Sequence, residues 1–336
     1  MTFLAAVLRE LNKPLELVEL EEPDNLGPGQ VWVRFHAAAI CGAQIGEIAG
    51  AKGPDPHLPH LLGHEGYGQV ESVGLGVRNV GVGNFVVAHW RKGLGMEALP
   101  PRYRTGCDII GAGPISTFAE YGLISENRLT PVSSISPGVG ALLGCAATTG
   151  IGAVVREAGT RPGESVLIIG AGGVGLSAIM GARLVSACPI CAVDKLDSKL
   201  RLAFHLGADL CCSWQEMKQQ FDVVIETTGE PALIEWGLAR TAANGGRLIL
   251  VGQPHFGEEV SFANFRQYYF GKTIMDSQGG GTIPHVDIPR LVKLYEENKL
   301  PLSHLITDSC PLEDINRGIE SMQRGEVVGR CVITMQ

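Results

Sequence analysis

The 336-residue sequence lacks the features that mark membrane-spanning or secreted proteins. No stretch approaches the roughly 18 uninterrupted apolar residues needed to span a bilayer. The start, MTFLAAVLRELNKP, has no basic segment followed by a long apolar run. The nine cysteines are an odd number without a repeating spacing, which is atypical of a disulfide framework. We therefore expect a cytoplasmic protein whose cysteines are reduced thiols or metal ligands.

The sequence also lacks an excess of basic residues and any low-complexity tract. Its formal net charge of −8 would repel nucleic acids and anionic membranes. Hydrophobic residues make up 45% of the chain and charged residues 18%, which is typical of a compact enzyme. The expected partners are small molecules or other protein subunits, and the length suits two domains.

The pattern of predicted secondary structure changes once along the chain. From Leu4 to about Pro131, short β-like runs such as VWVRFHAA and NFVVAHW alternate with Gly, Pro and Asn clusters, which predicts a mainly β domain. After about Gly144, apolar strands such as SVLIIG and FDVVIETTG alternate with helices, which indicates a parallel sheet covered on both faces. The last segment, with its closing strand GRCVITM, is expected to rejoin the β domain. We predict an α/β protein.

The segment 170–175 matches the glycine fingerprint of dinucleotide-binding folds, because it follows the strand VLII and opens a helix. Gly170 permits the tight turn, Gly172 lets the backbone approach a pyrophosphate, and Gly175 allows the helix to touch the strand. Gly173 and Val174 complete the loop. The phosphates would bind at the free amides of the helix N-terminus.

Asp194 ends the next predicted strand, where a carboxylate can accept hydrogen bonds from both ribose hydroxyls. This position favours NAD(H) over NADP(H), because a 2′-phosphate would meet a like charge. The alternative is an ordinary turn aspartate, and Lys195 directly after it weakens the charge argument.

Cys41, His64 and Cys145 lie far apart in the sequence but offer donors of the types that zinc prefers. Taken singly, each has an ordinary explanation, since free cysteines are often buried and a histidine in a β domain is usually structural. Together, two thiolates and one imidazole form a known donor set for catalytic zinc, with the fourth position open.

The segments GPGQVWVRFHAAAICG, GHEGYGQVESVG, GCAATTGIGAV and GAGGVGLSAIMGARLVSA occur in this order. With them, the chain resembles the zinc-dependent medium-chain dehydrogenase/reductase superfamily, specifically the alcohol dehydrogenase family, over essentially its full length. The resemblance implies a GroES-like catalytic domain made of residues 1–145 and 278–336. It also implies a Rossmann NAD-binding domain made of residues 146–277, with the active site in the cleft.

The resemblance further implies individual site residues. Zinc would bind Cys41, His64 and Cys145, with Glu65 nearby as an alternating or outer ligand. Trp90 falls where the family has an aromatic wall of the substrate pocket, although an ordinary core tryptophan is the alternative. Further cofactor contacts are implied for Thr149, Lys199, Val251, Gly252 and Gln253.

The lobe RKGLGMEALPPRYRTGC departs from the family, because it holds only Cys107 where a structural zinc needs four cysteines. We therefore expect one zinc per subunit and no structural zinc. The basic excess of this lobe is either an ordinary solvated surface or a contact for an anionic substrate.

The segment after Cys41 also departs from the family pattern, and this departure affects the path by which the alcohol proton leaves. Ala43 and Gly46 stand where the family usually has the hydroxyl and the histidine that carry the alcohol proton outward. Gln44 replaces the carboxylate that orients the zinc histidine; it can still accept a hydrogen bond but brings no charge. The remaining candidates for moving the proton are a water chain, a substrate group, Glu47, His60 and His89.

These features predict a zinc-dependent NAD oxidoreductase that interconverts a secondary alcohol or polyol and its carbonyl compound. The first alternative is an enzyme of the same fold with a different net reaction, suggested by Ala43 and Gly46. The second is a non-catalytic nucleotide-binding protein. The family also leads us to expect a homodimer or homotetramer, formed through the outer strand near 273–277. The structural cysteines are expected to be Cys188, Cys191, Cys211 and Cys212.

Overall fold

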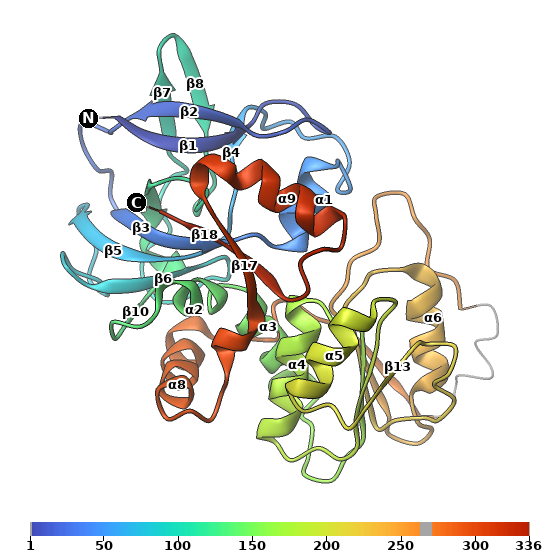
Figure 1. Ribbon diagram of the computed structural model, residues 1–336. Coiled ribbons are helices and arrows are strands. Elements are labelled where there is room, and N and C mark those ends of the chain that lie inside the picture. Colours follow the sequence, from blue (N-terminus) through green and yellow to red (C-terminus); the bar gives the residue numbers. More distant parts are fainter. Residues whose placement is uncertain (1, 263–270, 336) are drawn as a thin grey trace. The chain divides into compact units, whose positions relative to one another are not determined.

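The computed structural model describes residues 2–262 and 271–335 (Figure 1). These residues form two compact units, unit 1 with residues 1–145 and 283–336 and unit 2 with residues 146–282. The chain returns to unit 1 slightly later than the expected boundary at 277/278. The reason is local: Thr282 Oγ1 donates a hydrogen bond of 3.0 Å to the Thr148 carbonyl, so the segment before Ile283 stays with unit 2. No described helix is long and apolar enough to cross a bilayer.

Unit 1 contains two β-sheets. The first has the order β2-β1-β4-β8-β7 and contains β1 (Thr2–Leu8), β2 (Glu16–Glu21), β4 (His60–Leu61), β7 (Arg102–Thr105) and β8 (Asp108–Gly111). The second has the order β10-β6-β5-β3-β18-β17, with β9 also paired to β3. Its strands are β3 (Gln30–Ala39), β5 (Glu65–Val73), β6 (Phe85–His89), β9 (Tyr121–Ser125), β10 (Leu129–Val132), β17 (Ile306–Pro311) and β18 (Arg330–Thr334).

Both ends of the chain build unit 1, because β18 pairs antiparallel with β3 from Val332 opposite Ala39 (Figure 1). The core at this junction joins Ile40 near the N-terminus to Ile315 and Ile333 near the C-terminus. The helices of unit 1 are α1 (Gly42–Ile48), α2 (Pro137–Leu142), α8 (Pro284–Glu296) and α9 (Ile315–Gln323). The expectation that the final segment rejoins the β part of the molecule therefore holds.

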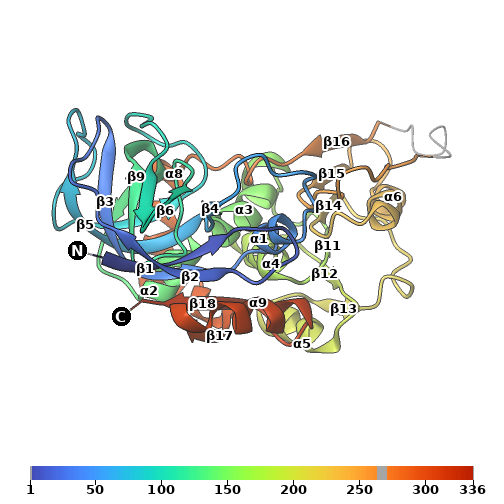
Figure 2. The same ribbon diagram turned by 90° about the horizontal axis from the view of Figure 1, so that it is seen from above.

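Unit 2 is built on one parallel sheet of the order β13-β12-β11-β14-β15-β16, whose strands lie side by side in Figure 2. They are β11 (Val166–Ile169), β12 (Ile190–Val193), β13 (Leu210–Cys212), β14 (Val223–Glu226), β15 (Arg247–Leu250) and β16 (Thr273–Asp276). The helices in the described part of unit 2 are α3 (Ala146–Gly152), α4 (Gly173–Leu184), α5 (Asp197–His205) and α6 (Pro231–Arg240), with a π-helical turn at Ala153–Glu157.

The central strands of unit 2 are apolar throughout because both faces of the sheet are covered. Every residue of β11, β12 and β14 is buried, including the sequences VLII and ICAV. By contrast, all four residues of the edge strand β16 are exposed. The strand order begins from β11 in the centre and extends outwards in both directions, as in doubly wound nucleotide-binding sheets. The predicted α/β fold class is confirmed.

Candidate active site

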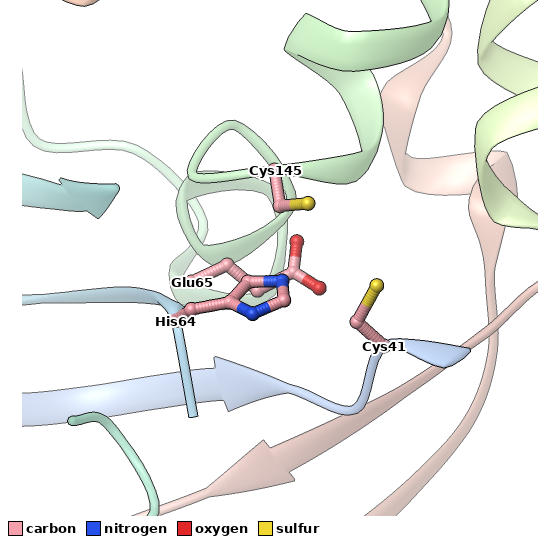
Figure 3. Close-up of side chains that lie close together, drawn as sticks. All are labelled: Cys41, His64, Glu65 and Cys145. Carbon is pink, nitrogen blue, oxygen red and sulfur yellow. The ribbon is translucent and has the colours of Figure 1, made fainter. Parts of the chain in front are cut away.

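Four potential metal ligands converge in unit 1, as Figure 3 shows. One donor atom from each of Cys41, His64, Glu65 and Cys145 lies within 4.8 Å of the others. Cys41 follows the end of β3, His64 and Glu65 stand where β5 begins, and Cys145 follows α2. The fold thus gathers residues from three distant segments, and the two cysteines and the glutamate are buried.

The protonation chemistry of this cluster suits a cation. The hydrogen bond from Cys145 is the largest influence on the Cys41 thiol, and it lowers the Cys41 pKa well below its usual value although burial opposes the change. His64 Nε2 is buried, and among the described residues it has no hydrogen-bond partner. A buried ring nitrogen without a partner, beside two thiols, belongs to the kind of donor set that zinc would complete.

Glu65 has a partner that sequence reasoning missed. Its carboxylate forms an ion pair with the Arg330 guanidinium of β18, and both side chains are almost fully buried. The two residues are 265 positions apart, so no local pattern could have revealed the contact. Arg330 compensates a buried negative charge at the rim of the metal cluster.

The glycine loop of unit 2 has the space that the fingerprint requires. Gly170 has a φ of 90°, and a Cβ there would lie 2.7 Å from Thr227 Oγ1. A Cβ on Gly175 would lie 1.8 Å from the Gly170 carbonyl oxygen, so helix α4 and the loop can touch only without a side chain. At Gly172 a Cβ would meet nothing within 4 Å, which leaves the backbone open to a ligand.

Asp194, at the end of β12, holds this loop in place. Its Oδ2 accepts a hydrogen bond of 2.8 Å from the Ala171 amide, and its Oδ1 accepts one of 3.0 Å from the Leu196 amide. Each carboxylate oxygen can accept more than one hydrogen bond, so ribose hydroxyls can still bind. Lys199 lies one turn into α5, and Thr149 is buried in α3.

The segment after β15 is tied back to β14 through its main chain. The amides of Val251 and Gly252 donate hydrogen bonds of 2.8 and 3.1 Å to the Glu226 carbonyl. Gln253 follows and packs closely against Gly229, where a Cβ would lie 2.4 Å from the Gln253 carbonyl oxygen. The amides of Val251 and Gly252 are therefore occupied within the protein.

Two family models match the chain: an alcohol dehydrogenase GroES-like domain at residues 27–134 and a zinc-binding dehydrogenase domain at residues 173–297. The S-(hydroxymethyl)glutathione dehydrogenase of Paracoccus denitrificans is 30% identical, over 98% of this chain and 99% of its own.

This chain belongs to the zinc-dependent alcohol dehydrogenase family.

Solved structures of similar proteins agree with this family. An alcohol dehydrogenase zinc-binding domain protein from Burkholderia ambifaria has a TM-score of 0.92 at 28% identity, covering 100% of this chain and 99% of that one. Benzyl alcohol dehydrogenase from Acinetobacter calcoaceticus has a TM-score of 0.89 at 26% identity, with 100% of both chains covered. The predicted family, its GroES-like and Rossmann folds and the oxidoreductase class are confirmed. Family membership also supports zinc and a nicotinamide cofactor.

Because Ala43 and Gly46 replace the family's usual proton-carrying residues, the contacts of His89, His60 and Glu47 decide which of them could take that role. His89 is buried, and burial lowers its pKa to about 4. Its Nδ1 donates a hydrogen bond of 2.7 Å to the Arg91 carbonyl, and its Nε2 lies 2.9 Å from Thr130 Oγ1. Both ring nitrogens of His89 are therefore engaged inside the protein.

Glu47 and His60 both line a cavity of about 710 Å³ in unit 1, and His64 and Gln44 line the same cavity. His60 Nδ1 faces the Leu61 carbonyl at 3.0 Å, and Nε2 faces Asp55 Oδ2 at 2.8 Å, so both nitrogens face acceptors. Glu47 forms an ion pair of 3.2 Å with Lys52 on the surface. Of the two residues, Glu47 is paired with one exposed lysine, whereas both nitrogens of His60 face acceptors.

The lobe that departs from the family is organised by carboxylates. Glu126 is buried and accepts main-chain hydrogen bonds of 2.7 Å from Arg78, Asn79 and Met96. Glu97 pairs with Lys92 at 2.7 Å. Arg128 and Asn127 also donate to Glu97, at 3.2 and 3.0 Å. Cys107 is exposed, and within the described part of the lobe no group of three metal donors occurs.

Trp90 precedes this lobe and is half-buried. The Arg91 guanidinium lies 5.9 Å from the centre of the Trp90 ring. The main-chain carbonyl of Trp90 accepts a hydrogen bond from Arg128. Of the basic residues in the lobe, Lys92 is therefore paired, Arg91 lies over Trp90, and Arg102 lines the cavity that His64 also lines.

Proposed function

We propose that this protein is a zinc-dependent NAD oxidoreductase that interconverts a secondary alcohol or polyol and the corresponding carbonyl compound. The convergence of Cys41, His64 and Cys145 in one cluster carries the proposal. We assign residues 1–145 and 278–336 to the catalytic domain and residues 146–277 to the NAD-binding domain. The substrate is a small molecule, and the protein is expected to act in the cytoplasm.

The donors of unit 1 fit zinc. Two thiols, one of them with a lowered pKa, and a buried imidazole nitrogen without a partner support Cys41, Cys145 and His64 as the direct ligands. Glu65 is close enough to alternate with an exchangeable ligand, while Arg330 holds its charge in place. When bound, zinc supplies a Lewis acid for the substrate oxygen, and the nicotinamide exchanges hydride with the adjacent carbon. We propose one zinc per subunit, because the lobe offers no donor set and the other group of three donors among the described residues, Glu47, Asp55 and His60, contains no thiol.

The carboxylate of Asp194 supports NAD(H) as the preferred cofactor. It lies at the end of β12 beside the glycine loop, where it would attract ribose hydroxyls and repel a 2′-phosphate. Thr149, Lys199 and the segment Val251–Gln253 are proposed as further cofactor contacts. Titration of the protein with NADH and NADPH tests the preference: NADH should bind about tenfold more tightly or better, and equal or reversed affinities would refute the role of Asp194.

Glu47 is our proposal for the group that takes the substrate proton towards solvent. Ala43 and Gly46 have no group that can carry a proton, and the nitrogens of His60 and His89 are engaged. Glu47 lines the cavity that also reaches His64. Glu47→Gln should lower kcat by roughly 100-fold, the lower end of what a positioned acid or base contributes, with zinc content unchanged. An unchanged kcat would favour a water chain or a substrate group instead.

A substrate panel decides between the proposed reaction and its alternatives. It should contain sugars, polyols, amino alcohols, phosphorylated alcohols, benzyl alcohol and S-(hydroxymethyl)glutathione, the last two named for relatives. Growth of the reduced nicotinamide absorbance with a secondary alcohol or polyol supports the proposal. Cofactor reduction that is transient, with no net NADH, would indicate the different net reaction suggested by Ala43 and Gly46. Metal-free protein that binds NADH would indicate a nucleotide-binding protein.

We propose a homodimer or homotetramer that associates through β16. Ile274 and Met275 on this edge strand are 40% and 38% exposed, and an unpaired strand edge is a template for a second copy. Ile274→Lys should shift the mass measured by light scattering to that of a smaller assembly. An unchanged mass would exclude this edge as the interface.

A further inference from the structure

The side-chain amide of Gln44 contacts both the Cys41 main chain and the His64 ring, but it has only one oxygen that can accept a hydrogen bond. Its Oε1 accepts a hydrogen bond of 3.1 Å from the Cys41 main-chain amide, where α1 begins. Its side-chain nitrogen faces His64 Nδ1. Gln44 is 2% exposed, so water cannot easily replace either partner. The sequence led us to expect that Gln44 would accept a hydrogen bond from His64, but the amide group turned towards the ring is the donor.

The tautomer of His64 follows from this contact. A neutral imidazole carries one N–H, and a nitrogen that accepts a hydrogen bond must be bare. Because the Gln44 amide donates to Nδ1, the proton of the neutral ring belongs on Nε2. Nε2 is the buried nitrogen left for the metal, and a nitrogen that binds a metal must also be bare. The metal-free arrangement therefore has its proton on the wrong nitrogen for metal binding.

Turning the amide over does not remove the conflict. The turned amide would accept from His64 Nδ1–H, which permits a bare Nε2, but its NH₂ group would then face the N–H of Cys41. In the observed orientation the Nε2–H of His64 is left without an acceptor, and in the turned orientation the N–H of Cys41 is left without one. A buried neutral group without its partner costs roughly 1–3 kcal/mol. A carboxylate in place of Gln44 would accept from both donors at once.

We propose that Gln44 holds metal-free His64 as the Nε2–H tautomer and thereby weakens the site's hold on zinc, compared with a carboxylate at the same position. Zinc binding then requires a tautomer change and a rearranged Gln44 contact, so part of the binding free energy is lost. Gln44 is a positioning residue, since it acts on the metal through His64. The inference rests on the metal site of the proposed function.

The test uses Gln44→Glu, which keeps the shape of the side chain and supplies two acceptors. Ring-¹⁵N-labelled histidine, observed by NMR in the zinc-free full-length protein, should report His64 as Nε2–H in the wild type and as Nδ1–H in the variant. Competition with a chromogenic chelator should show about 10- to 100-fold tighter zinc binding in the variant, the range typical of partners of metal-bound histidines. Gln69→Glu adds the same charge on β5 and should leave the tautomer unchanged.

Nδ1–H in the zinc-free wild type, or equal zinc affinities of wild type and Gln44→Glu, would overturn the inference. The wild-type spectrum decides the first point even if the variant folds poorly. Failure of the proposed function would look different: zinc binding and both tautomers as described, but no alcohol oxidation or carbonyl reduction on the substrate panel.

Discussion

The metal cluster and the lobe at residues 91–107 differ in whether their polar side chains find partners within the protein. In the cluster, two thiols and an imidazole come together, and one buried nitrogen has no partner within the described chain. In and against the lobe, the carboxylates of Glu97 and of Glu126, which accepts from the Met96 amide of the lobe, receive donors from the protein itself. The first region holds a buried nitrogen whose missing partner a cation could supply, whereas in the second region the partly exposed Glu97 and the buried Glu126 are paired within the protein. The metal site therefore differs from the lobe less in its cysteine content than in having a buried polar atom without a partner in the described part of the protein.

The largest expected effect separates the two regions by metal content. His64→Ala or Cys145→Ser should weaken zinc binding by more than about 100-fold and abolish alcohol oxidation, because a direct ligand is lost. Cys107→Ser, in the lobe, should leave the zinc content unchanged. Elemental analysis of the purified variants checks this difference. If Cys107→Ser lost as much zinc as the cluster variants, the lobe would also have to contribute to zinc binding.

The buried ion pair beside the cluster should give the next largest effect. Arg330→Met leaves the Glu65 carboxylate buried without its partner, so the free energy of unfolding should fall by about 3–5 kcal/mol. Urea denaturation of zinc-free protein measures this change without a contribution from the metal. The double variant Arg330→Met/Glu65→Gln should recover a part of the loss. A cost below about 1 kcal/mol for the single variant would mean that Glu65 does not depend on Arg330.

Glu126 tests whether carboxylates hold the lobe. Glu126→Leu removes the acceptor of three main-chain amides and should cost about 3 kcal/mol in unfolding free energy. Glu120→Leu is the matched control, because Glu120 accepts one main-chain amide, from Leu4 at 2.7 Å, and should cost about 1 kcal/mol. Thermal or urea unfolding compares them. Similar costs would show that the number of donors does not determine the effect.

The smallest expected effect concerns pH. Hydrogen bonding from Lys92 is the main cause that lowers the pKa of Glu97 from 4.5 to about 2. A carboxyl group with a lowered folded-state pKa stabilises the protein above its unfolded-state value, and this contribution is lost as the pH falls from about 4.5 to about 2. Glu97→Gln should therefore show a flatter dependence of melting temperature on pH in this window. Parallel curves for the two proteins would contradict the role of Glu97.

The sequence predicted the elements that depend on local pattern. The apolar runs VLII and ICAV became buried parallel strands, and the steric need for glycine at Gly170 and Gly175 follows from the turn itself. The convergence of Cys41, His64 and Cys145 was implied by family resemblance, since nothing in their spacing fixes a shared location.

What the sequence could not supply were partners set by the tertiary fold. Arg330 reaches Glu65 only because β18 is added beside β3 at the end of the chain. The Gln44 amide faces His64 across the cluster, and the role of Glu126 depends on loops that lie far from it in sequence. In each case a side chain's identity was visible, but the donor or acceptor facing it was not.

X-ray absorption at the zinc edge reports whether Cys41, His64 and Cys145 share one ion. For the zinc-loaded protein, we expect two sulfur ligands at about 2.3 Å and one nitrogen ligand at about 2.0–2.1 Å, with the remaining position held by a light atom. A zinc ion surrounded by oxygen and nitrogen alone, or protein that retains no zinc after loading, would contradict this expectation.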